Sequence, residues 1–245
     1  DRYQRWFSEG YRSSTDRCFD IGGQVRAALF DFEHDPRVPV TAERTTSAGN
    51  GAIMRLAPMV IAGFRSRSPR EVVATARLSA RETHFSVEAE AATEVFAALL
   101  VGALLGWSPE QLMDVSWAST GQPFDEVATR VISPDPRVRA SWEAETSGYI
   151  VNGLRLAVHG LLDFPSFKDA TLAIANMGGD SDTNAAIYGQ LGGAFYGIEA
   201  IPASWRERVY QGEEIDELAC ALVDLQLEAP VTRFDEDLQD EAPSA

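Results

Sequence analysis

Two carboxylates and a hydroxyl occur close together in segment 176–184, Asn-Met-Gly-Gly-Asp-Ser-Asp-Thr-Asn. Asp180, Asp182 and Thr183 offer hard oxygen atoms, which suit Mg²⁺, Mn²⁺ or Ca²⁺. The spacing is not that of an EF-hand loop, because the central glycine and the distal glutamate are missing. An octahedral ion needs about six oxygens, so these residues predict part of a metal site whose other ligands come from elsewhere.

The same segment has a second interpretation as helix punctuation. Gly178 and Gly179 can adopt the left-handed geometry that ends a helix. Asp180 or Asp182 can then cap the next helix. A cap needs only one acidic residue, and here two stand beside a threonine. On residue types alone, both interpretations stay open.

A glycine-rich segment, 47–55 (Ser-Ala-Gly-Asn-Gly-Ala-Ile-Met-Arg), predicts a turn that enters an apolar helix. Gly49 and Gly51 would let backbone N–H groups approach a ligand, and the positive end of a helix would favour an anion such as a diphosphate. No Gly-Lys-Ser/Thr follows, so the segment is not a Walker loop. Taken alone, it fits an ordinary Asn-Gly turn better.

Four further side chains lie on or beside expected helices. Asp20 precedes a helix, where capping is the default role, although a catalytic carboxylate would also profit from so rigid a place. His84 closes one helix before the next begins, and such a histidine commonly satisfies carbonyls or the helix dipole. Tyr149 is a single aromatic on a helix and is more often core than a ligand stack. His159 has no partner that the sequence indicates.

Helices must position these residues. Apolar residues recur at helical spacing, and the Ser-Pro pairs at 68–69 and 108–109 are N-caps followed by proline at the first helical position. No useful alternating strand pattern is found, since Val38-Pro39-Val40 is too short. We therefore predict an all-α fold with helices over 21–33, 52–64, 68–83, 86–106, 147–162, 166–177, 182–196, 202–210 and 213–227, another starting at 108, and a helix end at 3–10.

The composition excludes several classes of protein. No apolar run approaches the 18 residues of a membrane span, and the N-terminus is unlike a signal peptide. Two cysteines are too few for a disulfide framework, so a reducing compartment, the cytoplasm, is expected. The 21 basic residues are scattered among 37 acidic ones for a net charge of −16, which argues against nucleic acid as a partner. We expect one domain over 1–228 and an acidic, flexible tail over 229–245.

Taken together, these segments resemble the ADP-ribosylglycohydrolase family. Any one block is weak, whereas seven blocks in the family's order are specific. The blocks are Trp6 with Glu9-Gly10-Tyr11, then 18–22 (Cys-Phe-Asp-Ile-Gly), 47–58, Thr83-His84, Ser147-Gly148-Tyr149, 178–183, and Ile201-Pro202 with Trp205.

The resemblance implies an all-α hydrolase that cuts the glycosidic bond between ADP-ribose and a modified protein side chain or another acceptor. It implies two Mg²⁺ or Mn²⁺ ions in a central cleft, with an ADP-ribosylated protein or ADP-ribose conjugate as partner. It implies that Asp20 is the catalytic carboxylate. It also implies that the metal ligands include Asp180, Asp182 and Thr183. The residues expected to bind substrate are Ser47, Gly49, Asn50 and Gly51 at the diphosphate, and Phe19, His84 and Tyr149 around the ADP-ribose.

The sequence departs from the family pattern at several points. Gly23 stands where close relatives often have Asn, and Asn152 replaces an Asp, changes that could alter substrate contacts. His159 stands where Trp is frequent, which we expect to affect packing.

The family opens with a Gly-Asp turn, followed by a Thr-Asp-Asp-Thr segment that supplies other metal ligands. Neither occurs in this sequence. Three explanations stay open: the segment was removed or left out of this chain, a second chain supplies it, or the protein is an inactive, ADP-ribose-binding or crystallin-like relative. A metal-dependent hydrolase of another nucleotide-ribose conjugate is a further alternative.

Overall fold

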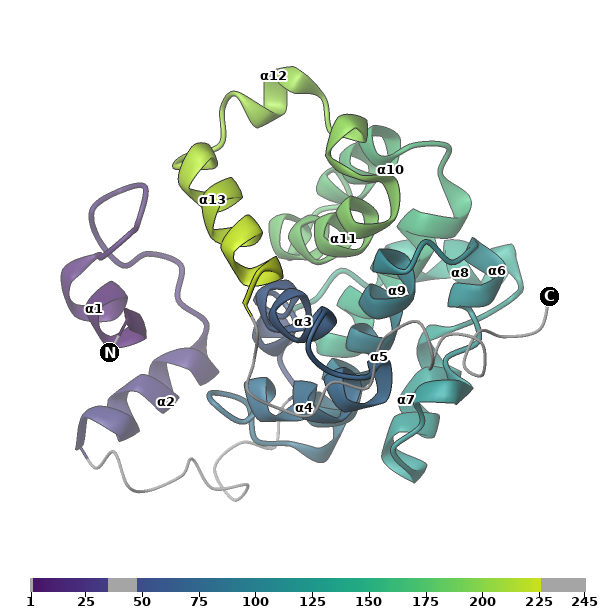
Figure 1. The fold of residues 1–245 in the computed structure, drawn as a ribbon, viewed down its shortest axis with the longest axis horizontal. Helices are drawn as coiled ribbons and strands as arrows, with labels where there is room; N and C mark the ends of the chain where they lie inside the picture. Colours follow the sequence, from purple (N-terminus) through teal and green to yellow (C-terminus); the bar gives the residue numbers. More distant parts are fainter. Residues whose placement is uncertain (1, 35–47, 226–245) are drawn as a thin grey trace.

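Helices make up the regular structure of residues 2–34 and 48–225, which the computed structural model describes (Figure 1). Over these ranges the backbone forms no strand and only an isolated bridge between Gly49 and Tyr149. The all-α prediction is therefore confirmed, while Val38-Pro39-Val40 lies outside the described residues. None of the described helices is long and apolar enough to cross a membrane.

Helix α5 (Val87–Leu104) forms the centre of the core (Figure 1). Its sequence is apolar on nearly every side, as is typical of a fully buried helix. Ser86 caps it by accepting a hydrogen bond from the backbone N–H of Ala89. The helices that pack most extensively against it are α3 (Ala57–Phe64), α4 (Pro69–Ala80), α7 (Gln122–Val131), α9 (Ile150–Asp163) and α11 (Ser181–Tyr196).

The remaining helices lie around this core. They are α1 (Arg2–Glu9), α2 (Gly23–His34), α6 (Pro109–Leu112), α8 (Pro136–Ser141), α10 (Phe167–Ala175), α12 (Ala203–Arg206) and α13 (Gly212–Val223). Short 3₁₀ turns join them at Asn50–Ala52, Ser116–Ala118, Trp142–Ala144 and Ile198–Ala200.

Most helix positions agree with the sequence analysis, and the differences have local causes. The helix expected over 52–64 begins only at Ala57, because Pro58 lacks an N–H and fits only in the first turn. The helix expected over 202–210 is a single turn, α12. Helices α7 and α8 were not predicted, although Asp135 before Pro136 is the same cap-and-proline signal that marks other helices.

Glycines let α9 and α11 pack closely. A Cβ on Gly160 of α9 would lie 2.6 Å from Cδ2 of Tyr188 on α11 and 3.0 Å from Cδ1 of Ile174. Tyr188 is fully buried and cannot swing away, so the ring fills the space that the glycine leaves. On α11 itself, a Cβ on Gly192 would lie 3.1 Å from Cδ2 of Phe167 of α10, so a glycine of this helix also serves close packing.

Replacing Gly160 by alanine is expected to destabilise the protein by about 1–3 kcal/mol through overpacking against Tyr188. Gly189, also on α11, is the matched control, because its Cβ would meet nothing within 4 Å. Gly189→Ala should stabilise the helix by about 0.5–1 kcal/mol. Urea unfolding monitored by circular dichroism measures both, and equal effects of the two substitutions would contradict the packing argument.

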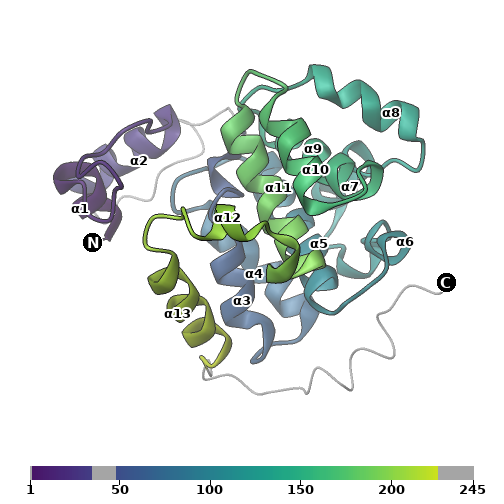
Figure 2. The ribbon, with the colours of Figure 1, turned by 90° about the horizontal axis from the view of Figure 1, so that it is seen from above.

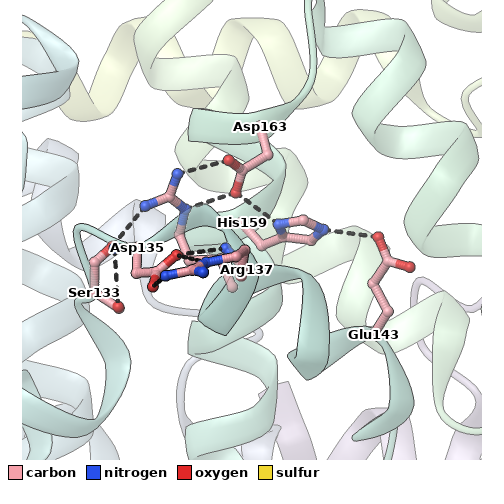
Figure 3. Close-up of polar contacts among 7 residues, drawn as sticks. Ser133, Asp135, Arg137, Glu143, His159 and Asp163 are labelled. Carbon is pink, nitrogen blue, oxygen red and sulfur yellow. Dashed lines mark hydrogen bonds and ion pairs between the residues drawn. The ribbon is translucent and has the colours of Figure 1, made fainter.

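A partly buried ionic network ties α8 and the Trp142–Ala144 turn to the end of α9 (Figure 3). Arg139 donates two hydrogen bonds of 2.6 Å to Asp163. The ring nitrogens of His159 lie 2.7 Å from Asp163 and 2.9 Å from Glu143. Burial would raise the pKa of Asp163, but the hydrogen bonds from Arg139 and His159 outweigh it and hold that pKa below its usual range. His159 thus has partners that its sequence context did not indicate.

Helices α1 and α2 lie side by side at one flank of the molecule (Figures 1 and 2). The side-chain amide of Gln4 donates to the carbonyl of Leu29 at 2.7 Å and so joins the two helices. Arg12, in the loop between them, forms an ion pair with Glu214 of α13. Residues of this flank line one side of a cavity.

Candidate active site

A cavity of about 1030 Å³ lies between the α1–α2 flank, the glycine-rich loop and the start of α11. It brings together segments that are far apart in the chain. Eight of the residues singled out from the sequence line it: Asp20, Gly49, Asn50, Gly51, His84, Asp180, Asp182 and Thr183. The cavity thus places the expected catalytic carboxylate, metal ligands and glycine-rich loop around one space.

The turn before α11 has the backbone that its two glycines predicted. Gly178 and Gly179 have φ values of +78° and +64°, in the left-handed region. Asp180 occupies the N-cap position, yet its side chain makes no capping hydrogen bond. Instead, its Oδ2 accepts a hydrogen bond of 2.7 Å from the side-chain amide of Asn50. The capping interpretation of Asp180 is therefore wrong, because the carboxylate is directed across to the glycine-rich loop.

Asp182 and Thr183 follow in the first turn of α11, where both line the cavity. Asp182 is exposed and Thr183 half-buried. With Asp180 they form a hard-oxygen set of the kind that Mg²⁺ and Mn²⁺ prefer. In the described part of the chain, no three His, Cys, Asp or Glu side chains are grouped closely enough to hold a metal ion. The three residues therefore fit a hard cation chemically but supply only some of its six ligands.

The glycine-rich loop is fixed by hydrogen bonds to the segment before α9. Asn50 N–H donates to the Gly148 carbonyl, and Ile150 N–H donates to the Ala48 carbonyl, each at 2.9 Å. The loop leads into a single 3₁₀ turn and not into an α-helix. The prediction that the loop leads directly into the positive end of an α-helix is thus wrong, because Pro58 fits only in the first turn and α3 begins at Ala57. Ser47 lies outside the described residues.

His84 packs beneath this loop. A Cβ on Gly51 would lie 2.9 Å from Cε1 of the His84 ring, so position 51 has no room for a larger residue. The ring is buried, with its Nδ1 2.8 Å from the Thr83 hydroxyl. Burial lowers the pKa of His84 to about 4, and the nearby positive charge of Arg55 adds to this effect. His84 is therefore a neutral group at physiological pH.

Asp20 also lines the cavity. Helix α2 begins only at Gly23, so Asp20 is not its N-cap, contrary to that interpretation. Its φ of +50° is unusual for a residue other than glycine and holds the side chain on a sharp bend. Such constrained residues cluster at functional sites.

Phe19 and Tyr149 are not among the residues that line the cavity. Phe19 is 51% exposed. The Tyr149 hydroxyl lies 2.5 Å from Oε1 of Glu88 and 2.5 Å from a guanidinium nitrogen of Arg130. Only the backbone of Tyr149 reaches the glycine-rich loop, through its bridge with Gly49. Roles for these two side chains in substrate binding remain predictions.

Several cavity residues were not assigned to the site from the sequence. Gln24 Oε1 accepts a hydrogen bond of 3.1 Å from the Gly49 N–H. Arg55 donates to the carbonyls of Gly51 (3.3 Å) and Ser79 (2.8 Å). The spacing of Arg55 four residues after Gly51 is a local signal that could have revealed it. No local signal connects Gln24 with Gly49, since only the fold brings them together.

Charges of both signs line the cavity. Arg2, Arg12 and Arg55 contribute to its lining, as do the aromatic residues Tyr3, Trp6 and Tyr11. Asp20, Asp180 and Asp182 are its carboxylates. A ligand with both an anionic part and a cationic or hydroxyl-rich part would find complementary groups here.

Comparison with known proteins identifies the family. The family model described as ADP-ribosylglycohydrolase matches residues 1–230. ADP-ribosylarginine hydrolase Tri1 of Serratia proteamaculans (strain 568) is 32% identical over 220 residues, which are 89% of this chain and 58% of that protein. ADP-ribosyl-[dinitrogen reductase] glycohydrolase of Rhodospirillum rubrum is 25% identical over 194 residues, covering 79% of this chain and 61% of that protein.

A solved structure gives the same result. The chain described as "ADP-ribosylglycohydrolase-related protein complex" superposes with a TM-score of 0.72 at 34% identity, covering 93% of this chain and 73% of that one. The present chain spans about three fifths of the length of the two curated relatives. On the match over residues 1–230, the chain belongs to the ADP-ribosylglycohydrolase family.

Proposed function

We propose that this chain hydrolyses the glycosidic bond between ADP-ribose and an arginine side chain of a modified protein. The observation that carries the proposal is the single cavity shared by Asp20, the glycine-rich loop and the Asp180–Thr183 segment. The name of the Serratia relative, an ADP-ribosylarginine hydrolase, supports arginine as the acceptor. A cationic guanidinium also suits a cavity that carries three carboxylates.

Asp180, Asp182 and Thr183 would hold divalent cations, Mg²⁺ or Mn²⁺, with further ligands from outside this set. Bound there, such cations would bind and orient the ribose hydroxyls. The glycine-rich loop would lie beside the diphosphate, because Gly49, Asn50 and Gly51 line the cavity together with Arg55. Arg2, Arg12 and Arg55 would add positive charge for the same anion.

Asp20 would act as the general base. In this scheme it accepts a proton from the water that attacks C1″ of the ribose, while the bond from C1″ to the guanidinium nitrogen breaks. The leaving guanidine takes up the proton that Asp20 has accepted and departs as the ordinary arginine cation. The transition state has oxocarbenium character, so nearby carboxylates lower its energy electrostatically.

Calorimetric titration with ADP-ribose, with and without Mn²⁺, tests the proposal. We expect binding that is at least about tenfold tighter with Mn²⁺, and release of free ADP-ribose from an ADP-ribosylated arginine peptide. Absence of ADP-ribose binding under both conditions would contradict the proposed substrate. Metal-dependent binding without release would instead identify an ADP-ribose-binding protein without turnover.

A further inference from the structure

The side chain of Asn50 is directed at a carboxylate and not at the open cavity. Its Nδ2 lies 2.7 Å from Oδ2 of Asp180, across 130 residues of sequence. A carboxylate only accepts hydrogen bonds, so the contact fixes which end of the amide faces Asp180. Asn50 is 7% exposed, and its backbone N–H donates to the Gly148 carbonyl at 2.9 Å. The amide is therefore held in place by the backbone behind it.

Asp180 is held just as firmly from its own side. Its backbone N–H donates to the Thr146 carbonyl at 2.8 Å. A Cβ on Gly179 would lie 2.3 Å from the Thr146 hydroxyl oxygen and 2.7 Å from its carbonyl oxygen, so the close approach requires glycine. A Cβ on Gly148 would lie 3.3 Å from Oδ2 of Asp180. Two segments, the glycine-rich loop and residues 146–148, thus hold the turn that carries this carboxylate.

We propose that Asn50 is a positioning residue for Asp180, an inference that rests on the proposed function. By holding Oδ2, the amide aims the carboxylate so that Oδ1 serves a divalent cation. The charge-assisted hydrogen bond also couples the glycine-rich loop to the cation site. Partners of this kind, which bind a ligand residue and not the metal, typically change metal affinity by about 10- to 100-fold. The family resemblance had cast Asn50 as a substrate contact.

A double-mutant cycle on Mn²⁺ affinity tests this role, using water-proton relaxation on the full chain. Asn50→Ala should weaken Mn²⁺ binding by about 10- to 100-fold. In an Asp180→Asn background, adding Asn50→Ala should change the affinity less than about twofold, because the group that Asn50 positions is already lost. Asn50→Leu, of similar size but without a donor, should behave as Asn50→Ala does.

Asn152→Ala is the matched control, because this asparagine is also buried, at 9% exposed, and donates to the Ser147 hydroxyl at 3.0 Å, but does not line the cavity. It should leave Mn²⁺ affinity within about twofold. Wild-type Mn²⁺ affinity in Asn50→Ala and Asn50→Leu would overturn the positioning role. An equal loss of Mn²⁺ affinity from Asn50→Ala in the wild-type and Asp180→Asn backgrounds would overturn it too. Lack of Mn²⁺ binding by the wild-type chain would overturn it as well. Retained Mn²⁺ binding without ADP-ribose binding would contradict the proposed function alone.

Discussion

Replacing Asp182 by asparagine is expected to lower Mn²⁺ affinity, and the release of ADP-ribose from a modified arginine, by more than about 100-fold, since even partners one step removed from a metal cost 10- to 100-fold. The side chain is exposed in the first turn of α11 and lines the cavity. Its contribution to stability is limited to interaction with the helix dipole, about 0.3–1 kcal/mol. Function should therefore fall much further than stability.

Asp169→Asn provides the matched control for this substitution. Asp169 also lies in the first turn of a helix, α10, where it accepts a hydrogen bond of 2.6 Å from the Ser166 hydroxyl. It does not line the cavity. This variant should lose up to about 1 kcal/mol of stability while keeping Mn²⁺ affinity. If Asp182→Asn lowered the free energy of unfolding by more than about 1 kcal/mol and left the Mn²⁺ affinity of the folded protein intact, its role would be that of a helix cap.

Local patterns in the sequence were sufficient to predict most of the helices. The Ser68 and Ser108 caps, each followed by proline, open α4 and α6 as expected, with capping boxes to Glu71 and Gln111. The apolar segment 86–106 became the central helix α5. The prediction failed where one residue overrides a long apolar pattern, as Pro58 does at the start of α3.

In the candidate site too, local features were predicted from the sequence and contacts between distant residues were not. The left-handed backbone at Gly178 and Gly179 is a local property, and it was predicted. The hydrogen bond between Asn50 and Asp180 joins residues 130 positions apart, and no local pattern contains that information. The same holds for His159, whose carboxylate partners include Glu143 from a separate turn. Residue types indicated which groups matter, whereas their mutual geometry depended on tertiary packing.

Lowering the pH from about 7 to 5 is expected to cost the folded state about 2 kcal/mol through His84 alone. The pKa of His84 is lowered from 6.5 to about 4 in the folded protein, mainly by burial. His84 therefore becomes protonated near pH 6.5 in the unfolded chain, but only near pH 4 in the folded protein. Stability from this residue is present above pH 6.5 and is lost progressively as the pH falls towards 4.

Urea unfolding of the wild type and of His84→Gln at both pH values isolates this contribution, because the other titrating groups are common to the two proteins. Glutamine keeps a polar side chain near the Thr83 hydroxyl but does not titrate. The variant should lose about 2 kcal/mol less than the wild type on acidification. An equal loss in both proteins would mean that the His84 ring takes up its proton while still folded. Such a proton would place a cation beneath Gly51, beside the loop expected to face the diphosphate.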